Sequence, residues 1–124
     1  MPVSGAMKGS KMNPTEFRKE LVKIMPGYEW TVHKSSNPEI YLEATGIQSS
    51  GFNRLSTLRV VRRERDGTAR YEVSSAGSGK RAPWLSTSED GTLARAFRSL
   101  QTFYENMAST YRSHASYLQN ARKA

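Results

Sequence analysis

Four arginines in this chain are spaced so that together they could bind an anionic group. They lie in two β-rich runs between Leu55 and Ser75, on either side of Asp66-Gly67. An Asp-Gly pair between such runs predicts a β-hairpin with a type I′ turn, in which both turn residues have positive φ. Because side chains alternate along a strand, this turn puts the four arginines on one face of the hairpin. They are Arg59, Arg63, Arg65 and Arg70.

The same turn predicts the register of the hairpin. The expected pairs are Arg65 with Thr68, Arg63 with Arg70, Val61 with Glu72, and Val60 with Val73. The second face then carries the apolar residues Leu58, Val60, Ala69, Tyr71 and Val73. Like charges directly opposite one another destabilise a sheet. The arginine face should therefore meet either a bound anion or carboxylates from elsewhere in the fold.

Two interpretations of the arginine face stay open at this point. In a meander, the outward side of the other strands would add Glu29, Glu39, Glu43 and Glu72 to the same surface. Glu43 could then neighbour Arg59, and the face would neutralise itself through exposed salt bridges. Alternatively, the arginines bind phosphate groups or dock a protein.

Two loops rich in glycine and serine add further candidate residues. The segment from Gly77 to Trp84 contains Gly-Ser-Gly-Lys, but Ser74 stands where a nucleotide phosphate loop has its first glycine, and Arg81 follows Lys80 instead of Ser or Thr. A basic loop that contacts a phosphate backbone is one hypothesis, with Phe52 or Trp84 stacking on bases. The alternative is that Trp84, which follows Pro83, packs on the core and holds the loop in place. The predicted nucleic-acid-binding residues are Arg54, Arg59, Arg63, Arg65, Arg70, Lys80, Arg81, Phe52 and Trp84.

The overall charge agrees with an anionic partner. The formal net charge is +8, and residues 51–87 hold eight Lys and Arg against three Asp and Glu. A basic region of this kind favours binding to nucleic acid, although charge by itself does not identify a partner.

Catalytic and metal chemistry have few candidate residues. Cysteine is absent, the only aspartates are Asp66 and Asp90, and His33 and His114 have no other ligand at metal-binding spacing. No hydrolase or metalloprotease motif is present. We therefore expect no enzymatic activity, no metal and no cofactor. The lack of cysteine fits a reducing cytoplasm, and no stretch is apolar enough for a membrane span.

Three elements precede the hairpin. A helix should begin at Asn13-Pro14-Thr15-Glu16, which has the residues of a capping box, and end at Pro26-Gly27. Alternating residues then predict strands over 28–33 and 40–45. A five-residue loop over 34–38 would pair Val32 with Ile40 and Trp30 with Leu42. Residues 46–53 and 76–84 are expected to be polar loops.

A long helix is predicted from about Glu89 to about Asn120. Its apolar residues follow a heptad spacing. Leu93, Phe97, Leu100 and Tyr104 should pack on the sheet. Because a helix of this length overhangs a short sheet, the distal positions should meet a second copy or a partner protein. These are Met107, Tyr111, His114 and Leu118.

The sequence thus predicts an α+β fold with two layers. A four-stranded antiparallel meander carries a short N-terminal helix and a long C-terminal helix on one face, in the order αββββα. Residues 1–12 are expected to be a disordered leader or an added tail, and residues 13–124 a single domain. The predicted function is a small basic, non-catalytic nucleic-acid-binding protein. The alternative is a homo-oligomeric adaptor or structural protein that acts through the long helix, and we expect a homodimer.

Overall fold

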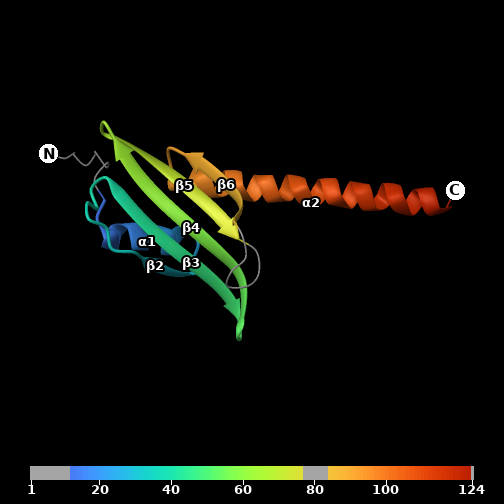
Figure 1. The fold of residues 1–124 in the computed structure, drawn as a ribbon, viewed down its shortest axis with the longest axis horizontal. Helices are drawn as coiled ribbons and strands as arrows, with labels where there is room; N and C mark the ends of the chain where they lie inside the picture. Colours follow the sequence, from blue (N-terminus) through green and yellow to red (C-terminus); the bar gives the residue numbers. More distant parts are fainter. Residues whose placement is uncertain (1–11, 77–83, 124) are drawn as a thin grey trace.

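The fold is a five-stranded antiparallel sheet with two helices on one face, seen in a computed structural model that describes residues 12–76 and 84–123. The elements are α1 (Pro14–Ile24), β2 (Glu29–Val32), β3 (Tyr41–Ser50), β4 (Asn53–Arg65), β5 (Thr68–Ala76), β6 (Trp84–Asp90) and α2 (Leu93–Lys123). The strands lie in chain order, β2-β3-β4-β5-β6, as Figure 1 shows. The predicted α+β meander is confirmed, with five strands instead of four.

The N-terminal helix begins where its capping residues predict. The Asn13 side chain accepts a hydrogen bond from the Glu16 backbone N–H at 2.8 Å, and the Glu16 carboxylate accepts one from the Asn13 N–H at 3.2 Å. This reciprocal pair satisfies two backbone donors that the first helical turn leaves free. Phe17 and Leu21 are fully buried against the sheet.

The central hairpin has the predicted register. Arg65 pairs with Thr68, Arg63 with Arg70, Val61 with Glu72, and Val60 with Val73. Both turn residues have positive φ, 54° at Asp66 and 78° at Gly67, which is the geometry that an Asp-Gly turn favours.

The predicted pairing of the first two strands is wrong. Trp30 pairs with Gly46 and Val32 with Ala44, so the connection between β2 and β3 is longer than a five-residue loop. The indole of Trp30 lies over Gly46, where a Cβ atom would come within 2.7 Å of the ring. A residue without a side chain is therefore what lets the tryptophan cross over β3 and enter the core.

Both predicted polar loops contain strand. Gly46 to Ser50 continue β3, because each has a ladder partner on β4. Trp84 to Asp90 form β6 against β5, and α2 accordingly begins at Leu93 instead of near Glu89. Asp90 accepts hydrogen bonds from the backbone N–H groups of Gly91 and Thr92, and Thr92 caps the helix through Arg95 N–H at 3.2 Å.

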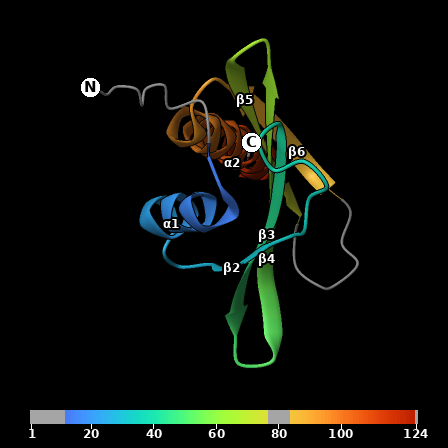
Figure 2. The same cartoon turned by 90° about the vertical axis from the view of Figure 1, so that its left-hand side faces the viewer.

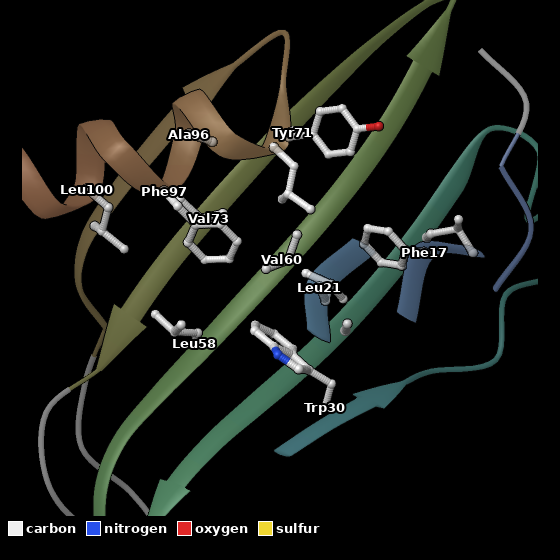
Figure 3. Packing of buried hydrophobic residues seen from close by; sticks show 13 residues of the cluster. Phe17, Leu21, Trp30, Leu58, Val60, Tyr71, Val73, Ala96, Phe97 and Leu100 are labelled. Atoms are coloured by element: carbon white, nitrogen blue, oxygen red, sulfur yellow. The ribbon is translucent and has the colours of Figure 1, made fainter. Parts of the chain in front are cut away.

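The core lies between the sheet and the two helices (Figure 3). Phe17 and Leu21 come from α1, and Ala96, Phe97 and Leu100 from the first turns of α2. They meet the apolar face of the sheet, which presents Trp30, Leu58, Val60, Tyr71 and Val73. Figure 2 shows both helices on this face, and Met12 also packs against the core.

Only the first part of α2 covers the sheet. In Figure 1 the helix crosses the sheet near β5 and β6 and then extends well beyond it. Most of its contacts with the body are made with these two strands, and Phe97 also contacts the Trp30 ring on β2. The predicted core positions Leu93, Phe97 and Leu100 are buried, Tyr104 is half-buried, and every residue from Ala108 to Lys123 is exposed.

Candidate functional site

The arginine face of the sheet is lined by ion pairs. Arg59 Nε lies 2.7 Å from Glu43 Oε2, and Arg63 Nη1 lies 3.0 Å from Glu72 Oε1. Arg70 Nε lies 3.6 Å from Glu89 Oε2. Three of the four arginines on this face therefore have a carboxylate beside them.

These pairs follow from the register of the sheet. Arg59 pairs with Thr45 in the ladder, so Glu43, two residues away, is its diagonal neighbour, as the sequence predicts. Arg63 faces Arg70, and Glu72 lies one diagonal step away on β5. Glu89 comes from β6, a strand that the sequence does not predict, so its role could not be anticipated.

Glu43 is the centre of a small polar network on this face. Besides Arg59, it accepts a hydrogen bond from the Tyr41 hydroxyl at 2.9 Å, and the Arg63 guanidinium lies 5.7 Å from the Tyr41 ring centroid. The hydrogen bond from Arg59 holds the pKa of Glu43 below its ordinary value. Burial, and then the hydrogen bond to Glu43, raise the pKa of Tyr41.

The other predicted nucleic-acid contacts do not form one site. Arg54 and Arg65 stand near opposite ends of β4, roughly 35 Å apart at the usual rise per residue. Phe52 is fully exposed at the turn between β3 and β4, and Trp84 is half-exposed at the start of β6. Within the described residues, neither Arg54 nor Arg65 has an ion-pair partner. Lys80 and Arg81 lie outside the described residues.

Arg62 is a charged residue that sequence reasoning missed. It alternates with Arg63 on β4, so its side chain enters the helix-covered face and is completely buried. Its Nε donates to the Tyr71 hydroxyl at 3.1 Å, and its Nη2 lies 3.2 Å from Glu64 Oε1. The alternation of side chains along β4 could have identified Arg62 as buried, because it places this residue on the same face as Leu58 and Val60 and not with the other arginines.

The distal positions of α2 are open to solvent. Met107 is half-buried, whereas Tyr111, His114 and Leu118 are exposed. Their spacing continues the row that packs on the sheet through Phe97 and Leu100. The helix therefore presents apolar side chains with nothing from the described part of its own chain to cover them.

Neither a metal site nor a membrane span is found in the described part of the chain. Among residues 12–76 and 84–123, no three His, Cys, Asp or Glu side chains are grouped so that they could hold a metal ion. His33 instead hydrogen-bonds Thr45 at 2.7 Å, and His114 lies against the Tyr117 ring. No helix among these residues is both long and apolar enough to cross a bilayer.

Two surfaces therefore stand out, the ion-paired face of the sheet and the uncovered part of α2. Comparison of the chain with protein-family models, with curated proteins and with solved structures gives no match.

Proposed function

We propose that this protein is a non-catalytic assembly or adaptor protein that associates with a second copy of itself through α2. The observation that supports this proposal is the contrast within one apolar row of the helix. Phe97 and Leu100 are 7% and 4% exposed, whereas Tyr111 and Leu118 in the same row are 64% and 65% exposed. The part of α2 from residue 107 to residue 123 is called the distal arm below.

The distal arm should not be stable as a helix unless it packs against another surface. It is about 25 Å long at 1.5 Å per residue, and isolated helices of this length are marginal in water. Exposed apolar rows on soluble proteins usually mark an interaction site. Packing against α2 of a second copy would bury Tyr111 and Leu118 and stabilise the helix at the same time. Because the chain lacks cysteine, we further propose that this assembly works in the reducing cytoplasm.

A charge placed in the apolar row tests the proposal. Tyr111→Glu should convert dimers into monomers, because the new carboxylate would have to be buried without a partner. Ser109→Glu is the matched control, since residue 109 lies on the opposite side of the helix and should leave the dimer intact. Light scattering after size exclusion measures both masses, and circular dichroism checks the fold. Equal masses for Tyr111→Glu and the parent would refute the proposal.

Nucleic-acid binding is the second candidate, and one observation favours it. Phe52 is fully exposed at a hairpin tip, and Arg54 beside it has no ion-pair partner among the described residues. An exposed ring next to a guanidinium without an ion pair in the described part of the chain is a combination that can stack on a base and contact a phosphate. The ion pairs at Arg59, Arg63 and Arg70 leave less positive charge available on the rest of the sheet.

A salt-titrated binding assay tests this second candidate. With single- and double-stranded DNA and RNA, log affinity should fall linearly with log salt, and Arg54→Ala should reduce that slope by about one unit. Phe52→Ala should weaken single-strand binding without changing the slope. Arg59→Ala is the control, because its guanidinium is already paired with Glu43. Wild-type affinity and slope in Arg54→Ala would remove Arg54 from the site.

A further inference from the structure

An open groove runs beside the first half of α2. Its volume is about 710 Å³. One wall is α2 itself, and the other is formed by the end of α1 and the residues after it, Met25 and Tyr28. Leu58 of β4 and Ser75 of β5 line the floor. Tyr28 donates a hydrogen bond to Ser56 at 2.9 Å, and Ser75 bonds to Tyr104, so these four hydroxyl groups are satisfied. This is the base groove.

The side of α2 that faces the base groove forms a regular row. Its members inside the groove are Ala94, Arg98, Gln101 and Glu105. The same 4-3-4 spacing continues into the distal arm as Ala108, Arg112, Ala115 and Gln119. The groove-facing residues and the distal-arm residues thus form one continuous side of α2. Only the first half of this side lies next to the base groove.

This row is complementary to itself when a second copy runs antiparallel. A two-fold axis near Ala108 brings Gln101 opposite Ala115, and Arg98 opposite Gln119. The same axis brings Glu105 of each copy opposite Arg112 of the other, which gives two pairs of opposite charge. A parallel pairing would instead put Glu105 level with Glu105 and Arg112 level with Arg112. Charge complementarity therefore favours the antiparallel direction.

The apolar positions fit the same register. The axis that aligns the polar row places Leu118 within about 3 Å of the level of Leu100, and Tyr111 within about 3 Å of the level of Met107, at about 1.5 Å of rise per residue. The small side chains of Ala108 and Ala115 let the two helices approach closely. Each distal arm then reaches the wall of the partner's base groove, near Tyr28 and Leu58.

We propose that the distal arm of a second copy lies antiparallel in the base groove, and that the exchange is reciprocal. This inference rests on the self-association proposed above and assigns it a geometry. Both grooves and both arms are used, so the assembly closes as a symmetric dimer and leaves no arm free to recruit a third chain. A parallel contact between distal arms alone would leave both base grooves open.

Engineered cysteines distinguish the two geometries, because the chain has none of its own. Gln101→Cys and Ala115→Cys variants are purified separately, mixed, allowed to exchange and oxidised. In the antiparallel dimer residue 101 of one copy lies opposite residue 115 of the other, within reach of a disulfide. Residues 101 and 101, or 115 and 115, are more than about 20 Å apart along the axis. A covalent dimer should therefore form in the mixture and not in either variant alone.

The outcomes separate this inference from the proposed function. Cross-linking of Ala115→Cys with itself would show a parallel pairing, which overturns the antiparallel geometry while leaving self-association intact. Dimers by light scattering with no cross-link in the mixture would also overturn it. Monomers in every variant and in the parent would refute both proposals.

A charge exchange gives an independent readout. Glu105→Arg should raise the dimer dissociation constant by about tenfold, because two opposite-charge pairs become like-charge pairs. Adding Arg112→Glu to the same chain should restore the parent value. If the double variant is as weak as Glu105→Arg, residues 105 and 112 do not face each other, and the proposed register is wrong.

Discussion

At the scale of single residues, charge on the sheet is organised by strand parity. Arg59, Arg63 and Arg70 each have a glutamate on the neighbouring strand. Surface pairs of this kind contribute about 0–1 kcal/mol each. Their main effect here is to neutralise a face that would otherwise carry several adjacent positive charges.

The pair between Glu43 and Arg59 should make stability depend on acid pH. Because the pKa of Glu43 is lowered in the folded state, its contribution is present above the unfolded pKa and is lost as pH falls through the folded pKa. Glu43→Gln should lower the unfolding free energy at neutral pH by less than about 1 kcal/mol and flatten its decrease on the acid side. Urea unfolding at neutral and acid pH measures this. Glu29→Gln is the control, since Glu29 has no ion pair among the described residues. Equal acid slopes for the parent and Glu43→Gln would show that the Glu43–Arg59 pair does not contribute to the acid dependence.

Gly46 should be intolerant of any side chain. A Cβ atom there would meet the Trp30 ring at 2.7 Å, and that ring is nine-tenths buried or more, so it cannot simply swing away. Gly46→Ala should destabilise the fold by about 1–3 kcal/mol, as overpacking of a core does. Gly27→Ala is the matched control, because its nearest neighbour would lie at an ordinary 3.8 Å. Thermal unfolding of both variants, followed by tryptophan fluorescence, tests this, and an unchanged midpoint in Gly46→Ala would contradict it.

Arg62 shows where residue-level prediction fails. Its neighbours on β4 alternate between core and surface, and parity assigns Arg62 to the core. Charged residues are rarely buried unless they are paired, so the residue type predicts that Arg62 is exposed where the alternation along the strand predicts that it is buried. The hydroxyl of Tyr71 and the carboxylate of Glu64 supply the partners. Tyr71 lies opposite Arg62 in the predicted register, and Glu64 lies two residues further along the same strand, so the alternation along β4 was the better guide.

At the scale of elements, the hairpin was predictable because its signal is local. The Asp-Gly turn fixes the register of the whole β4–β5 pair, and α1 is likewise specified by its capping residues. The continuation of β3 from Gly46 to Ser50 was not predictable, because glycine has low strand propensity and most of the residues after it are polar. These residues are strand only because β4 supplies their ladder partners, which is information from distant parts of the chain.

The turn itself gives a testable consequence. Gly67 has a φ of 78°, a region that residues with a side chain adopt only at a cost. Gly67→Ala should lower the unfolding free energy by about 1–2 kcal/mol, and Gly67→Asn by less, because asparagine tolerates this conformation. Denaturant titration of the two variants measures the difference. Equal losses in both would show that backbone conformation is not the cause.

At the scale of the whole molecule, the chain divides into a two-layer body and a distal arm. The heptad row of α2 predicts the arm, since a 31-residue helix is longer than the strands that it crosses. The base groove was not predictable, because it is formed by α1, two strands and α2 together. A symmetric dimer would cover both the apolar residues of the distal arm and the base groove beside the start of α2.

Sedimentation equilibrium of the unmodified protein tests whether this chain forms a dimer. Measured across the accessible range of concentrations, the mass should rise to twice the 13.9 kDa of the single chain and stop there, because a closed two-fold dimer has no free surface left for a third copy. A mass that stays at 13.9 kDa at every concentration would show that the chain does not pair through α2 or through any other surface.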